Sequence, residues 1–324
     1  MVQRSSSPAR SSRFSTARAR PQPLRVSIAI RGETVRLIAH SVNGVKSVGP
    51  IDATSLLEKS AQLCALLETE SCREPQLRTV VRELSTSLLD PIESAIDGCS
   101  DLVVNLPRGP LGIPLDLLTY RRSPLFLKRP VSYRIGKTGA EPSSCELPLS
   151  AFILSDRTAD PERACLAIAA LLGRVTYQDD REATLDFLHL QTRKDVIVFS
   201  LHGRVGGKEP DHMQMSTGKV LPDDLNGLQP RLVYLDSCRL GVSRTFLNRF
   251  RAMGTKYYVA PIISNEAGES STRTMTLFFK HLIAGKPPEV ALFLTRKELW
   301  HLYRECDARS RWWRSFAFRV YRLN

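Results

Sequence analysis

The sequence predicts an α/β protein whose mostly parallel, twisted sheet carries helices on both faces, in a three-layer α/β/α arrangement. Short apolar, β-branched segments such as 195–201 and 231–237 are typical of strands buried on both faces. From residue 149 onward such segments alternate with helical segments, and this alternation is characteristic of doubly wound parallel sheets. A chain of 324 residues with 42% hydrophobic content can also bury a large core.

Three regions divide the chain. Residues 1–22 are rich in Ser, Arg and Pro with few apolar side chains, which predicts a disordered basic tail. The same Arg- and Ser-rich, acid-free composition also occurs in transit peptides, which is a competing interpretation. Residues 23–77 are expected to form an extension of a β-hairpin followed by helix, and residues 78–324 the main domain.

The elements follow in order from local patterns. Alternating apolar and polar residues on either side of Arg31-Gly32 predict the hairpin, and Pro91 is expected to kink or end the second helix. Residues 107–118 are rich in turn formers and lead into a short helix, and 136–147 form a linker dense in chain breakers. The predicted strands are 24–31, 33–40, 101–106, 131–135, 149–154, 174–177, 195–201, 231–237, 256–261 and 312–321. The predicted helices are 53–67, 76–95, 160–172, 182–189, 243–253, 266–283 and 288–303.

Several classes of protein find no support in these residues. No run approaches 18 consecutive apolar residues, so a membrane span is not expected. The seven cysteines are scattered without a CxxC pair, which favours reduced thiols in a cytoplasmic protein and gives no zinc ribbon. P-loop, GxGxxG and HExxH motifs are absent from the sequence, so we expect no cofactor and no metal.

The net charge of +13 first suggests a nucleic-acid partner. Most of that excess lies at the ends of the chain, however. Residues 1–20 hold five arginines and no acid, and 304–324 hold six arginines against two acids. The body of the protein is therefore only mildly basic, and we expect direct nucleic-acid binding to be a minor alternative.

Two strand ends carry the residues with the strongest chemical signal. His202 and Gly203 follow one apolar strand, and Cys238 follows the next. If the strands are parallel neighbours, both side chains emerge at the carboxyl edge of the sheet, where α/β proteins place their sites. Their spacing of 36 residues leaves room for the required crossover.

This pair is suited to nucleophilic catalysis on a carbonyl group. A thiol attacks as thiolate, so an imidazole that takes its proton and later gives it to the leaving amine completes the reaction. The backbone N–H groups of Gly203 and Cys238 are candidates for the oxyanion hole. Taken singly, a Cys or a His after a strand is more often a packing or polar residue.

The same residues resemble a known family. Leu201-His202-Gly203 and the Asp-Ser-Cys segment at 236–238 are similar to the motifs of caspase-like cysteine peptidases, most closely the CHAT group related to separase. Residues 111–118, 131–133 and 312–316 resemble three further CHAT segments in the same order, so the resemblance covers about 78–324. It implies a caspase-like fold in which His202 is the base and Cys238 the nucleophile.

The resemblance also suggests specificity. Asp236 precedes Cys238 by two residues, so on a strand both point to the same side. Metacaspases with a similar Asp-Ser-Cys motif use that aspartate to cut after basic residues, which implies preference for Arg or Lys here. The alternative is that Asp236 caps a turn or pairs with a nearby arginine such as Arg239 or Arg244.

The leading hypothesis is therefore a cytoplasmic cysteine endopeptidase. The family resemblance implies antiviral defence in prokaryotes, an activating partner, and a protein substrate such as a gasdermin-like effector. Two alternatives stay open: a catalytically silent CHAT-fold adaptor, and a basic nucleic-acid-binding protein.

Overall fold

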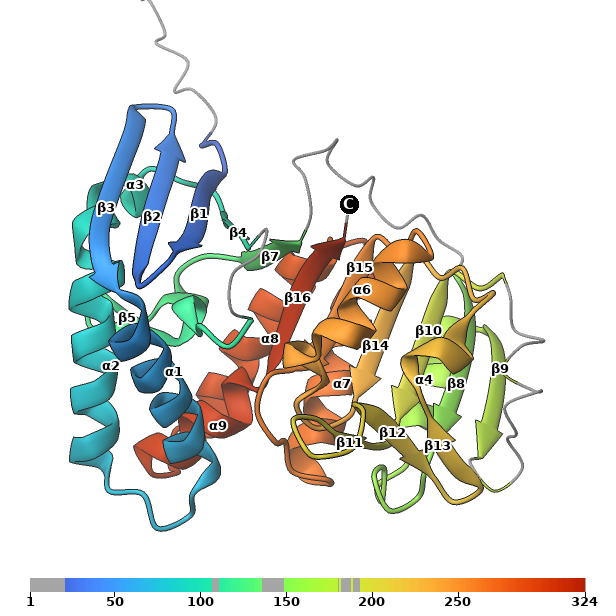
Figure 1. Ribbon diagram of the computed structural model, residues 1–324. Coiled ribbons are helices and arrows are strands. Elements are labelled where there is room, and N and C mark those ends of the chain that lie inside the picture. The colour runs from blue at the N-terminus through green and yellow to red at the C-terminus, as the bar shows by residue number, and fades with distance from the viewer. Residues whose placement is uncertain are drawn as a thin grey trace, which may run out of the picture.

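A computed structural model describes residues 21–106, 111–135, 149–179, 181, 188 and 193–323. Eleven of the described strands form one sheet in the order β3-β2-β1-β4-β7-β16-β15-β14-β10-β8-β9 (Figure 1). Most neighbouring pairs are parallel; the exceptions are β15–β16 and the two pairs within β1–β3. Helices cover both faces, so the predicted three-layer α/β/α class is confirmed.

The N-terminal extension belongs to this sheet. The predicted hairpin is confirmed as β1 (Leu24–Arg31) and β2 (Thr34–Ser41), and β3 (Gly44–Asp52) adds a strand that the sequence patterns did not reveal. β1 pairs in parallel with β4 (Leu102–Asn105), so the extension continues the main sheet. The boundary at residue 77 remains a prediction.

Two helices follow the extension strands. α1 (Ala53–Glu68) begins where the Asp52 carboxylate accepts a hydrogen bond from Ser55 N at 2.6 Å. α2 (Glu74–Leu88) ends before Pro91, which stands in the short η1 (Asp90–Ile92) before α3 (Glu93–Asp97). The expected effect of Pro91 on the second helix is thus confirmed. The turn-rich segment contains η2 (Leu115–Leu117), and β5 (Thr119–Tyr120), β6 (Ser123–Pro124) and η3 (Leu125–Leu127) follow.

The second half of the sheet holds the two strand ends of interest. Its strands are β7 (Val131–Ile135), β8 (Ser150–Ser155), β9 (Arg174–Asp179), β10 (Val196–Ser200), β14 (Leu232–Asp236), β15 (Tyr257–Pro261) and β16 (Phe318–Leu323). Its helices are α4 (Ala164–Leu172), α6 (Arg244–Ala252), α7 (Glu269–Ile283), α8 (Pro288–Leu302) and α9 (Ala308–Phe316). α4, α7 and α8 pack in series on one face, and α6 lies on the other (Figure 1).

Two expected elements differ from the structure. The closing strand predicted at 312–321 is wrong in its first half, because α9 runs to Phe316 and only then does β16 begin. Asp307 accepts from Ser310 N at 3.0 Å and caps this helix, and the buried Trp312 and Phe316 stand four residues apart, on one helical face.

The segment after His202 is also more regular than expected. It forms a small antiparallel sheet of β11 (His202–Arg204), β12 (His212–Met215) and β13 (Gly218–Val220), followed by η4 (Pro222–Leu225). Met213 and Met215 are buried there and serve packing. The predicted linker at 136–147, residues 1–20 of the predicted tail at 1–22, and most of the helix at 182–189 lie outside the described residues.

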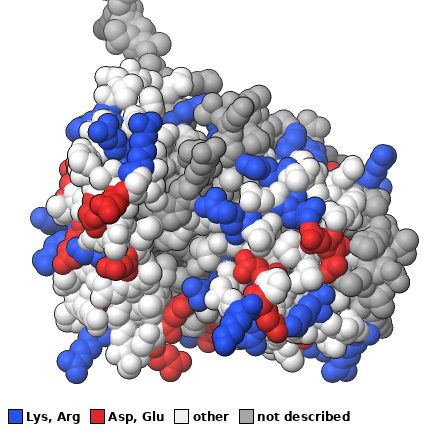
Figure 2. All heavy atoms as spheres, in the orientation of Figure 1, with Lys and Arg blue, Asp and Glu red and all other residues white. Residues whose placement is uncertain are grey.

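Among the described residues, no helix is both long and apolar enough to cross a bilayer. Figure 2 shows acidic side chains interspersed with basic ones over the face that it presents.

Candidate active site

The two strand ends identified in the sequence are parallel neighbours. β10 and β14 pair in register, with Ser200 opposite Asp236, and β8 pairs on the other side of β10 with Ser155 opposite Ser200. His202 and Cys238 each stand two residues beyond a paired position. Both therefore follow the carboxyl edge of the large sheet, and His202 is the first residue of the small β11–β13 sheet. The predicted common edge is confirmed.

Gly203 brings the two loops into contact. A Cβ atom at this position would lie 2.3 Å from the carbonyl oxygen of Cys238 and 2.8 Å from its backbone nitrogen. Such distances leave no space for a side chain, so glycine is needed for the His202 loop to lie on the Cys238 peptide. Gly203 is therefore required for the contact between the His202 loop and the cysteine loop.

The cysteine loop is fixed by a sharp turn and two tyrosines. Arg239 has a φ of 61°, which turns the chain directly after Cys238. Tyr258 Oη donates to the carbonyl oxygen of Leu240 at 2.7 Å, and Tyr321 Oη donates to that of Gly241. These buried contacts hold the segment that follows the thiol, so Cys238 stands on a rigid support.

Cys238 is half-buried, and its thiol contacts one residue of the β15–α7 loop. Cys238 Sγ lies 3.5 Å from Asn265 Oδ1 and 3.7 Å from the Asn265 carbonyl oxygen. Burial raises the pKa of the Cys238 thiol. In this conformation the thiol is thus a protonated donor to Asn265, and deprotonation requires a base.

His202 is held from its other side. Its side chain is 42% exposed, and Nε2 lies 2.7 Å from Thr158 Oγ1 and 3.9 Å from Asp156 Oδ2. Among the described residues, His202 and Cys238 share no hydrogen bond. Catalytic hydrogen bonds are often long in unliganded enzymes and shorten only with substrate bound.

Asp236, the last residue of β14, is buried and surrounded by neutral donors. Its carboxylate accepts from Ser271 Oγ at 2.6 Å, Asn265 Nδ2 at 2.7 Å and Ser200 Oγ at 3.2 Å. Burial raises the pKa of Asp236 to about 6 despite these hydrogen bonds. The partners of Asp236 are hydroxyl and amide groups, so the alternative of pairing with Arg239 or Arg244 gains no support.

The β15–α7 loop covers both groups at once. Asn265 contacts Cys238 through its oxygen atoms and Asp236 through its amide nitrogen. The neighbouring Ser264 donates its backbone N–H to Glu68 Oε1 of α1 at 2.5 Å, and its carbonyl accepts from Trp313 Nε1 of α9 at 2.6 Å. The N-terminal extension therefore contacts the loop that covers the thiol.

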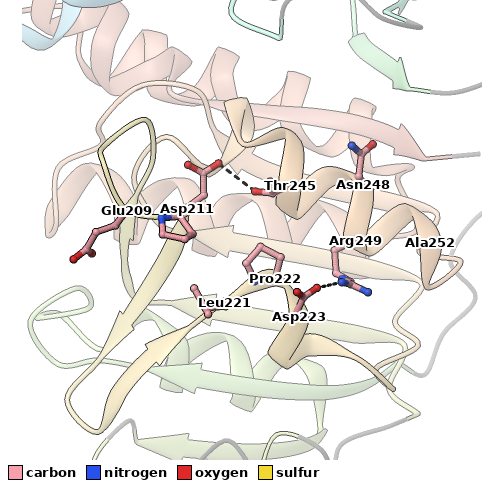
Figure 3. A pocket seen from close by; sticks show the side chains of 10 residues that line it. Glu209, Asp211, Leu221, Pro222, Asp223, Thr245, Asn248, Arg249 and Ala252 are labelled. Atoms are coloured by element: carbon pink, nitrogen blue, oxygen red, sulfur yellow. Dashed lines mark hydrogen bonds and ion pairs between the residues drawn. The ribbon is translucent and has the colours of Figure 1, made fainter.

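A surface pocket of about 670 Å³ lies in the region of α6 and η4 (Figure 3). Asp211 and Thr245 face each other there, and Arg249 pairs with Asp223. None of the residues that line it is His202, Cys238 or Asp236, so we assign it no part in catalysis. Within the described ranges, no group of three or more acidic, histidine or cysteine side chains is arranged to hold a metal ion.

Sequence patterns missed Asp156, Thr158 and Asn265. The first two follow β8, a third strand that ends at the same edge, so the rule that identified His202 could have found them. Asn265 stands in a loop without periodicity, and no local signal marks it.

Comparison with known proteins does not assign a function to this chain. No protein-family model matches the chain, and no curated protein matches its sequence. Among the solved structures that match, one described as "Structure of Protease" is 9% identical, with 82% of this chain and 75% of that chain covered and a TM-score of 0.45. A likeness this distant carries no functional argument.

Proposed function

We propose that the protein is a cysteine endopeptidase with His202 as base and Cys238 as nucleophile. The observation that carries the proposal is the contact between the two strand ends: adjacent parallel strands in register, with Gly203 packed on the Cys238 peptide. An imidazole and a thiol at one sheet edge, on rigid supports, are the two groups that acyl transfer through a thioester requires.

The proposed reaction has two stages, formation of a thioester with Cys238 and hydrolysis of that thioester. The proton of the Cys238 thiol passes to His202, and the thiolate adds to the carbonyl carbon of the scissile bond. Backbone N–H groups of Gly203 and Cys238 donate to the resulting oxyanion. The C–N bond then breaks as the leaving amine takes the proton from His202. Water hydrolyses the thioester with His202 again as base, which releases the acid and restores the thiol.

Asp236 is proposed to select basic residues on the acyl side of the cut bond. Its carboxylate lies on the strand that precedes Cys238. Because the carboxylate is buried, pairing with a cationic substrate side chain would offset part of its desolvation cost and so favour binding. Asn265 covers Asp236 in this structure, so a substrate Arg or Lys must displace its amide. We further propose that a partner protein activates the enzyme and that its substrate is an effector protein.

A fluorogenic-peptide assay tests this function. We expect cleavage after Arg or Lys and not after Asp, abolished in Cys238→Ala and His202→Ala, with Cys99→Ala as the matched control at a buried thiol away from the site. The intact mass of the wild type should also show self-cleavage after arginines of the N-terminal tail, such as Arg18, absent in Cys238→Ala. Equal activity of wild type and Cys238→Ala would overturn the proposal.

A catalytically silent adaptor is the second candidate. The observation that favours it is that Asn265 forms hydrogen bonds with both the Cys238 thiol and the Asp236 carboxylate in this conformation. Iodoacetamide distinguishes the two, because a functional nucleophile is alkylated at Cys238 much faster in wild type than in His202→Ala. Equal rates in both proteins would support the adaptor.

A further inference from the structure

The loop after β8 provides His202 with a hydrogen-bonded partner that the dyad does not include. Thr158 Oγ1 lies 2.7 Å from His202 Nε2 and donates its own proton to Asp156 Oδ1 at 2.9 Å. Asp156 Oδ2 lies 3.9 Å from the same imidazole nitrogen. The three side chains therefore form a chain from carboxylate through hydroxyl to imidazole.

This chain is anchored to the sheet. The Asp156 N–H donates to the carbonyl oxygen of Ser200 at 2.8 Å, which ties the end of β8 to the end of β10. Thr158 N donates to Asp156 Oδ1 at 2.8 Å, so the same carboxylate oxygen fixes both the backbone and the hydroxyl of Thr158. Asp160 N donates back to the Asp156 carbonyl at 2.8 Å and closes the turn. The hydroxyl is thus held in place although Thr158 is exposed.

The direction of these hydrogen bonds determines the tautomer of His202. A hydroxyl has one proton, and an ionised carboxylate can only accept, so the Thr158 proton lies toward Asp156. Thr158 Oγ1 must then accept from His202, which requires the imidazole proton on Nε2. Nδ1 is left with its lone pair, as the nitrogen that can receive a proton.

We propose that Thr158 is a positioning residue for His202, acting with Asp156 to hold the imidazole proton on Nε2 and to present Nδ1 to Cys238. The proposal rests on the peptidase function proposed above and adds to it a three-residue chain. When the Cys238 proton moves to Nδ1, the imidazolium keeps its Nε2–H donated to Thr158, and its positive charge stands near the Asp156 carboxylate. The proton then leaves from Nδ1 to the amine, so Thr158 and Asp156 end unchanged.

Substitutions at Thr158 test this role by separating kcat from KM. Thr158→Val removes the hydroxyl and keeps the shape, so we expect kcat to fall between about 10- and 1,000-fold while KM changes less than about twofold. Thr158→Ser keeps the hydroxyl and should recover most of the lost rate. Thr245→Val is the matched control, because Thr245 is also exposed and also donates to an aspartate, Asp211, away from the dyad.

Nitrogen-15 NMR of the imidazole gives a readout that needs no peptidase activity. In the wild type we expect the proton of neutral His202 on Nε2, and in Thr158→Val a mixture of tautomers, with the resonance assigned by its loss in His202→Gln. An Nδ1–H tautomer in the wild type, an unchanged kcat in Thr158→Val, or no recovery in Thr158→Ser would each overturn the positioning role. If the wild type cleaves no peptide without its proposed activating partner, the tautomer alone decides whether Thr158 positions His202.

Discussion

At the scale of single residues, Asp236 carries a carboxylate that is buried and hydrogen-bonded only to neutral groups. Three neutral groups hydrogen-bond its carboxylate, yet burial still raises its pKa to about 6, from an ordinary value of 3.8. A carboxylate whose pKa is raised on folding stabilises the protein only when it is protonated. Its contribution is fully present below about pH 4 and is lost as the pH rises to about 6.

Asp236→Asn should therefore stabilise the protein at neutral pH. Two units of pKa correspond to about 3 kcal/mol, so the free energy of unfolding should rise by up to this amount at pH 8 and by less at pH 5. Urea denaturation at both pH values measures the gain. Cleavage after Arg should fall in the same variant.

The matched control is Asp223→Asn, an aspartate that is 77% exposed. It should change the unfolding free energy by less than about 0.5 kcal/mol at either pH. A destabilised Asp236→Asn at pH 8 would mean that the three hydrogen bonds outweigh the cost of burying the charge.

Residues at strand ends could be predicted from the sequence because their signal is local. An apolar run that stops at a polar residue marks both the strand and its edge, and this located His202, Cys238 and Asp236. The partners of these residues could not be predicted in the same way. Asn265 and Ser271 meet Asp236 across about 30 residues of chain, and no pattern within a short window records such a contact.

At the scale of elements, the loop between β15 and α7 connects the site to the N-terminal extension. Its Ser264 is bound by α1 through Glu68 and by α9 through Trp313. The residues of α9 from Trp312 to Phe316 were predicted as strand, although Trp312 and Phe316 are both buried and have helical spacing. The contact between Glu68 of α1 and Ser264 of the loop joins residues 196 positions apart, and no local pattern in the sequence indicates it.

Removal of the Glu68 carboxylate should loosen this loop. In Glu68→Ala the Ser264 N–H loses a charged acceptor, so its amide exchange with deuterium should become about 10-fold faster or more. Glu68→Gln keeps a neutral acceptor and should give an intermediate rate. Hydrogen-exchange mass spectrometry of peptides covering 262–268 measures the effect.

Glu58→Ala is the control, since Glu58 is an exposed residue of the same helix. It should leave exchange in 262–268 unchanged. An unchanged rate in Glu68→Ala as well would show that Trp313 alone holds the loop.

Across the whole molecule, a buried charge cluster joins the two halves of the chain. Asp116 Oδ2 pairs with Arg296 Nη1 of α8 at 3.0 Å, and Oδ1 pairs with Arg319 Nη2 of β16 at 3.3 Å. Arg319 also donates to the carbonyl oxygens of Leu111 and Ile113. Burial alone would raise the pKa of Asp116, but the two arginines outweigh it and hold the pKa below its usual value.

Asp116→Asn should be strongly destabilising. It leaves two buried guanidinium groups without their shared counter-charge, and loss of one partner from a buried pair costs about 3–5 kcal/mol. Because the pKa is lowered on folding, the wild-type contribution is present above about pH 4 and is lost as the pH falls below it. The difference in unfolding free energy between wild type and variant should thus be larger at pH 7 than at pH 3.5.

Denaturant titration with circular dichroism measures both values. Arg78→Gln, which breaks an exposed pair with Glu74 on α2, should cost less than about 0.5 kcal/mol. A loss of that small size in Asp116→Asn would contradict the assigned role of the cluster.

The class of the fold could be predicted from β-α alternation, whereas the order of the strands could not. Which strand lies beside which depends on contacts between distant segments. The parallel pairing of β1 with β4 is an example, since nothing in residues 24–31 indicates that they extend the main sheet.

The double engagement of Asn265 has a consequence for how the protein could be switched. One amide side chain masks the sulfur atom that would cut and the negative charge that would choose where to cut. Any event that moves this side chain away would expose the thiol and the carboxylate at once. The enzyme would then gain its reactivity and its preference for basic residues in a single step.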